Sequence, residues 1–82
     1  MNENLERVSS RIATTVEKFF ADVSTAPNPV FFAEELRERI ASEIGVVAPD
    51  SPGRIMRALR QAGRINYRVL DRAQSYYQVL PA

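Results

Sequence analysis

Two residue types that carry much of protein chemistry are missing from this sequence of 82 residues, which holds no cysteine and no histidine. Without cysteine, disulfide bonds and thiolate metal sites are excluded, and the redox compartment cannot be inferred. Without histidine, the most common general base and the most common metal ligand are excluded as well. The chain also has no glycine-rich phosphate loop and no convincing carboxylate pair. We therefore expect neither an enzyme nor a cofactor-binding protein, and no metal site.

Long apolar segments are missing too. No run approaches the roughly 18 residues that span a bilayer, and the N-terminus lacks the basic-then-apolar order of a signal peptide. We therefore expect a cytoplasmic protein. A chain of 82 residues with 45% hydrophobic residues predicts one small domain with a modest core and no room for a second domain.

Acidic residues are nearly absent from the second part of the chain. Residues 1–50 hold five basic and nine acidic side chains, whereas residues 51–82 hold six arginines and a single acid, Asp71. Such asymmetry favours a polyanion as the partner of the second part. Arginine binds phosphates and guanine edges through two parallel hydrogen bonds, which lysine cannot do.

Apolar residues recur every three or four positions in three segments, which predicts helices over residues 4–24, 33–44 and 51–62. Pro27 and Pro29 end the first helix. Gly45 and Gly63 follow the other two, because glycine takes a left-handed backbone at little cost. The expected caps are Asn2 or Asn4 for the first helix and Asp50 or Ser51 for the third, with Pro52 in its first turn. The expected buried stripes are Leu5, Val8, Ile12, Val16, Phe19, Phe20 and Val23, then Leu36, Ile40, Ala41 and Ile44, then Ile55, Leu59 and Ala62, with Met56 at the flank.

The end of the chain alternates in the manner of strands. Residues 64–70 predict a half-buried strand with Ile65, Tyr67 and Val69 facing inward. A polar turn over residues 71–74 and a second strand over 75–80 complete a hairpin. Residues 30–32 form a short segment of side chains that favour β-strands. This segment predicts either an edge strand or an apolar entry to the second helix. The phenylalanines are expected in the core: Phe19, Phe20, Phe31 and Phe32.

From residue 32 to 79, this order of elements resembles the winged helix-turn-helix family. FFAEELRERIASEIG is similar to the first strand and helix of that motif, VVAPDSPGRIMRALRQAG to its turn and recognition helix, and RINYRVLDRAQSYYQV to its wing. The resemblance implies an α+β, mostly helical fold, a three-helix winged helix-turn-helix with a C-terminal β-hairpin wing. One domain would cover residues 1–82, with an N-terminal helix in 1–26, the helix-turn-helix in 30–63 and the wing in 64–80. The turn near residues 45–50 is longer than in the simplest members.

The third helix and the hairpin supply the candidate contacts. With the apolar face of the helix toward the core, the opposite face carries side chains that read guanine and adenine in the major groove, and the flanks carry side chains suited to phosphate. Arginines at this spacing repel by a few tenths of a kcal/mol per pair, a cost that a bound partner offsets. The candidate DNA-binding residues are Ser51, Arg54, Arg57, Arg60, Gln61, Arg64, Arg68, Arg72 and Gln74.

Our preferred hypothesis is sequence-specific binding of double-stranded DNA by a transcriptional regulator, with helix 51–62 in the major groove and hairpin 64–80 as the wing. By analogy with winged-helix regulators, the N-terminal helix is a candidate for a homodimer contact, because one chain would bury its four phenylalanines with difficulty. The alternative is that the apolar stripe of this helix completes the core of a monomer. The alternative is a protein-interaction module, an adaptor or inhibitor whose basic helix meets an acidic protein surface. RNA binding is a weaker idea, since the sequence lacks the aromatic sheet platform for single strands.

Overall fold

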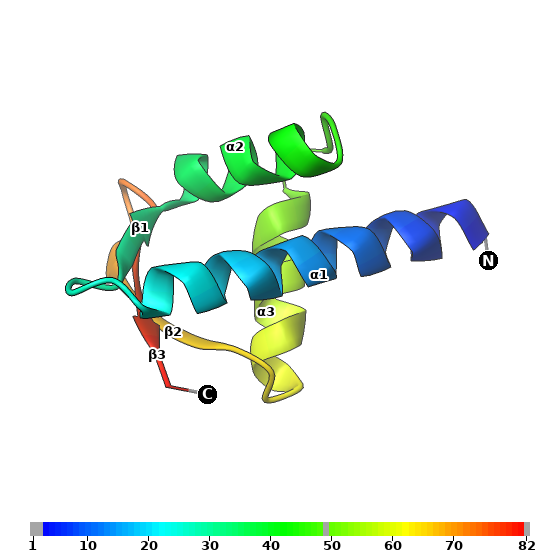
Figure 1. Cartoon of the computed structure of the whole chain (residues 1–82). Coiled ribbons are helices and arrows are strands. Elements are labelled where there is room, and N and C mark those ends of the chain that lie inside the picture. Colours follow the sequence, from blue (N-terminus) through cyan, green and yellow to red (C-terminus); the bar gives the residue numbers. More distant parts are fainter. Residues whose placement is uncertain (1–2, 49, 82) are drawn as a thin grey trace.

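The computed structural model describes residues 3–48 and 50–81, and the side chains of those residues from Ser10 onward. Its helices are α1 (Glu3–Ser24), α2 (Ala33–Glu43) and α3 (Ser51–Gln61), and its strands are β1 (Val30–Phe32), β2 (Asn66–Asp71) and β3 (Tyr76–Leu80). The helix α1 packs against both α2 and α3. The strands lie near the C-terminal end of α1 and the N-terminal end of α2, and α3 runs across these two helices (Figure 1). The predicted α+β, mostly helical class is confirmed.

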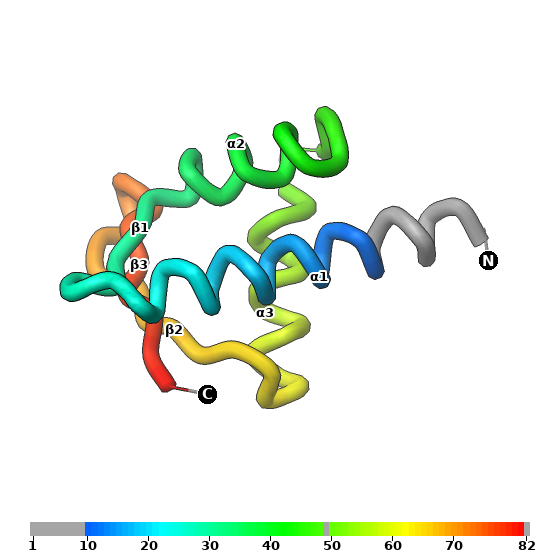
Figure 2. Tube along the Cα trace, in the orientation of Figure 1, coloured from blue at the N-terminus to red at the C-terminus, as the bar shows by residue number. Residues whose placement is uncertain are grey.

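The three strands form one antiparallel sheet in the order β1-β3-β2. Residues 30–32 pair with residues 76–78, so the edge strand was the correct alternative for this segment. The predicted hairpin is also confirmed, with Tyr67 opposite Val79 and Val69 opposite Tyr77. The register shifts between Val69 and Asp71, which is the local irregularity of a β-bulge. The sheet therefore joins a segment from before α2 to the hairpin after α3, as the tube in Figure 2 shows.

The core is built where α1 meets the sheet and the other two helices. Phe31 of β1 lies edge-on to Phe19 and Phe20 of α1, with ring centroids 5.0 and 5.2 Å apart. Such edge-to-face pairs add stability beyond the area that they bury. The predicted positions Leu5 and Val8 fall outside the described side chains. The buried hydrophobic residues are Ile12, Val16, Phe19, Phe20, Phe31, Leu36, Ile40, Met56, Leu59, Ile65, Tyr67 and Val79.

Several predicted core positions are wrong. Phe32 is 41% exposed, because neighbouring residues of a strand face opposite sides and Phe31 takes the inner one. Its ring stacks on Tyr76 instead, with centroids 4.5 Å apart. Val69 lies on the same face of β2 as Tyr67 but is 42% exposed, because it lines an open hollow beside α3 rather than the core.

The buried faces of α2 and α3 are also shifted from the prediction. Ala41 and Ala62 are exposed, because Ala41 lies beside the stripe formed by Leu36 and Ile40, and Ala62 lies beyond the last residue of α3. Met56 occupies the core rather than the flank and is 2% exposed.

One smaller expectation is corrected at the start of α1. Asn4 lies inside this helix, which begins at Glu3, and Asn2 is outside the described residues. In the turn between α2 and α3, Val46 is 98% exposed, whereas its neighbour Val47 packs against the core.

Gly63 fixes how the chain leaves α3. Its φ of 76° lies in the left-handed region that glycine adopts at little cost. Its N–H donates to the carbonyl of Arg60, and the N–H of Arg64 donates to the carbonyl of Leu59, both at 3.0 Å. These two bonds form a Schellman motif, which ends the helix and turns the chain back. The chain then enters β2, whose Tyr67 and Val69 line a hollow together with residues of α3. Gly45 confirms the other glycine prediction, with a φ of 123°.

Candidate nucleic-acid interface

The exposed face of α3 carries three of the predicted residues. Arg54, Arg57 and Gln61 are all exposed, and their spacing of three and four places them in one stripe along the helix. Met56 and Leu59, which anchor the opposite face, are buried. The structure therefore brings these three polar side chains together, as the sequence predicted.

Beside this stripe, α3 and the hairpin enclose a hollow of about 390 Å³, which we call the basic groove. Arg57 and Arg60 reach its edge from α3, and Arg72 reaches it from the turn between β2 and β3. Among the residues that the structure describes, no acidic side chain lines it. Its remaining lining is apolar or aromatic apart from the tyrosine hydroxyls. The lining residues are Gly53, Met56, Arg57, Arg60, Tyr67, Val69, Arg72 and Tyr77.

Arg60 is held in place by an aromatic ring. Its guanidinium carbon lies 4.9 Å from the centre of the Tyr67 ring, within the range of a cation–π interaction. Tyr67 is 4% exposed, and its ring meets the rings of Phe20 and Tyr77 edge-on, at centroid distances of 5.9 and 5.6 Å. The core therefore fixes the ring, and the ring positions the guanidinium at the edge of the groove.

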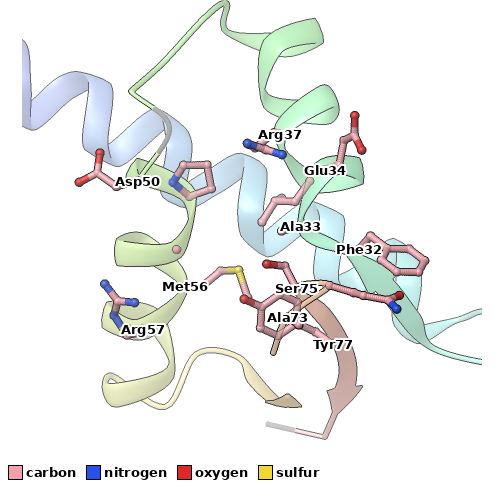
Figure 3. A pocket seen from close by; sticks show the side chains of 14 residues that line it. Phe32, Ala33, Glu34, Arg37, Asp50, Met56, Arg57, Ala73, Ser75 and Tyr77 are labelled. Carbon is pink, nitrogen blue, oxygen red and sulfur yellow. The ribbon is translucent and has the colours of Figure 1, made fainter. Parts of the chain in front are cut away.

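A second hollow, of about 440 Å³, lies between the starts of α2 and α3 and the hairpin turn. Figure 3 shows Met56 reaching from α3 toward Tyr77 of β3, and both residues line the basic groove as well. This second hollow has mixed charge, because Glu34 and Asp50 line it together with Arg37 and Arg57. Of the two hollows, the basic groove is therefore the one whose lining has arginines and no acidic residue.

Ser51 does not reach the surface as the prediction required. It is 8% exposed, and its hydroxyl accepts a hydrogen bond from Nη2 of Arg54 at 3.3 Å. Arg54 also lies 3.7 Å from a carboxylate oxygen of Asp50. Asp50 occupies the cap position of α3, but its side chain makes no capping hydrogen bond. The first turn of α3 therefore offers the exposed Arg54 rather than a free serine hydroxyl.

Two predicted arginines lie away from the groove. Arg64 forms an ion pair with Glu17 of α1, with Nη2 and Oε2 3.4 Å apart. Arg68 donates from Nε to the side-chain oxygen of Gln78 at 2.7 Å. Since Tyr67 and Val69 line the groove, strand alternation places Arg68, between them, on the other face of the sheet.

The two candidate DNA-binding residues in the hairpin turn, Arg72 and Gln74, have different surroundings. Arg72 lines the basic groove, whereas Gln74 lines the second hollow. The backbone N–H of Gln74 donates to a carboxylate oxygen of Asp71 at 3.2 Å. Asp71, the single acid of this half of the chain, is therefore engaged with the backbone of the turn.

Acids of the first half are partly neutralised by their own neighbours. Arg39 pairs with Glu43 on α2 and lies 3.0 Å from Asp22 of α1. The hydrogen bond from Arg39 holds the pKa of the Glu43 carboxyl below its ordinary value, and the same bond raises the pKa of Arg39. Glu35 accepts the N–H of Phe32 at 2.7 Å at the start of α2. None of these acids lines the basic groove.

Comparison of the chain with family models, with curated proteins and with solved structures gives no match. Over the residues that the structure describes, the helices are too short or too polar to cross a lipid bilayer.

Proposed function

We propose that this chain binds double-stranded DNA through the exposed face of α3 and the adjacent basic groove, in a winged helix-turn-helix arrangement, and acts as a transcriptional regulator. The observation that carries the proposal is the basic groove. Three arginines from two separate elements line one hollow, and no acid is among its lining residues. Guanidinium groups gathered without acids favour a ligand with several negative charges, such as a phosphate backbone.

The dimensions of α3 support the same proposal. Its 11 residues give a length of about 16 Å, and a major groove about 12 Å wide admits an α-helix. The stripe of Arg54, Arg57 and Gln61 would then meet base edges, since arginine and glutamine pair with guanine and adenine there.

The alternative is a protein-interaction module, and the outer face of the sheet favours it. Phe32 is 41% exposed and stacks on the half-buried Tyr76. Aromatic residues left at a surface are common at protein interfaces. A module of this kind would pair tightly with a protein and show no affinity for a duplex.

The proposal is tested by comparing two arginine variants in binding to duplex DNA, followed by fluorescence anisotropy. Arg57→Ala is expected to weaken binding by about tenfold or more, because a lost hydrogen bond between charged groups costs roughly 1.5–3 kcal/mol. Arg64→Ala removes the same charge from a side chain already paired with Glu17, and is expected to bind within about twofold of the parent chain. Thermal unfolding by circular dichroism confirms that both variants fold. Equal affinity of the parent chain and Arg57→Ala would contradict the proposal.

A further inference from the structure

Beyond the proposed function, we propose that the outer face of the sheet binds single-stranded RNA, with one base stacked on the ring of Phe32. We call outer the face of the sheet that is turned away from α1. The basic groove lies on the inner face, where Tyr67 lines it, so the two surfaces are separate. The outer face carries Phe32 of β1, Arg68 of β2, and Tyr76 and Gln78 of β3.

The first feature of the outer face is a pair of stacked aromatic rings. Phe31 meets the rings of α1 on the inner face, so its neighbour Phe32 points outward. Phe32 lies opposite Tyr76 in the register of β1 and β3, and their ring centroids are 4.5 Å apart. This aromatic pair was not expected from the sequence, which predicted Phe32 in the core.

The position of the pair leaves room for a base. Because β1 is an edge strand and Phe32 is 41% exposed, a base can extend the stack on the side of Phe32 away from Tyr76. Proteins bind single-stranded RNA in this way, by stacking unpaired bases on aromatic side chains that a sheet presents.

The second feature is a polar pair beside the rings. Arg68 is exposed, and its Nε donates to the side-chain oxygen of Gln78 at 2.7 Å. A guanidinium has five N–H donors, so the same group can also donate to a phosphate. The amide nitrogen of Gln78 can donate to a ribose 2′-hydroxyl, the group by which a protein distinguishes RNA from DNA. The other charged residue of the three strands, Asp71, accepts the backbone N–H of Gln74 in the hairpin turn.

The experiment measures the affinity for a labelled oligouridine of about 12 nucleotides, by fluorescence anisotropy at low salt. Phe32→Leu keeps an apolar side chain and removes the ring. We expect this variant to weaken RNA binding by about fivefold or more, the loss of one stacked base. Phe32→Tyr keeps a ring and should bind RNA as tightly as the parent chain. Thermal unfolding compares the stability of both variants, and the affinity of Phe32→Leu for duplex DNA should equal that of the parent chain.

Val46→Ala is the matched control, because it shortens another exposed apolar side chain, at the opposite end of α2 from Phe32. Its affinity for oligouridine should be unchanged. Equal RNA affinity of Phe32→Leu and the parent chain would overturn the inference. Absence of oligouridine binding by the parent chain would also overturn it and would favour a protein as the partner of the outer face, while binding of duplex DNA through α3 could still stand. Tighter binding of an oligothymidine of the same length would overturn the choice of RNA.

Discussion

At the scale of single residues, the contact between Arg60 and Tyr67 links the core to the candidate site. Tyr67 is buried among aromatic rings, and it also lines the basic groove. The sequence predicted an inward-facing Tyr67 and a flanking Arg60, but not that the two would meet. Their contact depends on the path of the chain around Gly63, which no spacing in the sequence reports. The structure thus adds a positioning residue that the sequence pattern did not indicate.

Replacing the ring tests this role. Tyr67→Leu is expected to weaken duplex binding by about two- to fivefold, since a cation–π contact near the surface is worth roughly 0.5–1 kcal/mol. Tyr67→Phe keeps the ring and should bind like the parent chain. Both affinities are measured by fluorescence anisotropy, with urea unfolding to compare the stability of the variants.

A double-mutant cycle separates positioning from stability in this test. In an Arg60→Ala background, Tyr67→Leu should weaken binding no further, because the side chain that it positions is gone. An equal loss with and without Arg60 would show that Tyr67 acts only through the fold.

At the scale of elements, the relation between α3 and the hairpin decides the shape of the site. The sequence predicted the helices over 33–44 and 51–62 and the hairpin after them, because apolar periodicity and turn residues are local signals. The sequence predicted less accurately which residues of each element are buried. Ala62 was expected to be inside and is exposed, because the helix ends before it. Phe32 was expected inside on its hydrophobicity alone, whereas strand pairing turned it outward.

The end of α3 provides an element-scale prediction. Gly63→Ala is expected to destabilise the domain by about 1 kcal/mol, because alanine is strained at a left-handed φ, here 76°. Gly53→Ala is the matched control. Gly53 lies in the first turn of α3 with nothing within 4 Å of an added Cβ, so this change is expected to stabilise the helix by roughly 0.5 kcal/mol.

Urea unfolding measures the free energy of unfolding for both glycine variants. Changes of the same sign in Gly63→Ala and Gly53→Ala would contradict the described end of α3. The control separates the strain of a left-handed backbone from the helix propensity of alanine, since of these two positions Gly63 has a left-handed φ and Gly53 does not.

At the scale of the whole molecule, one chain closes a core around Phe19, Phe20 and Phe31. A single chain was expected to bury its four phenylalanines with difficulty. It buries three of them and leaves Phe32 at the surface. A homodimer through the N-terminal helix stays a prediction, to be checked by sedimentation at several protein concentrations. Among the described residues, Phe19, Phe20 and Phe31 are buried without a second copy.

The formal net charge of the chain is +1, but its basic and acidic side chains are unevenly distributed over the fold. Arg39 and Arg64 are paired with acids of α1 and α2, whereas the lining of the basic groove holds arginines and no acid. The difference in charge between the two halves of the chain is visible in the sequence. The sequence did not predict that Arg64 would pair with Glu17, because the two residues are far apart in the sequence and adjacent in the fold.

The most direct measurement is binding of the parent chain to a random-sequence duplex of about 30 base pairs, by fluorescence anisotropy at several salt concentrations. Our account predicts binding at low salt that weakens steeply as the salt concentration rises, because arginines displace counterions from the phosphates. Absence of binding at the lowest salt, or an affinity that does not change with salt, would contradict DNA binding through the basic groove and α3.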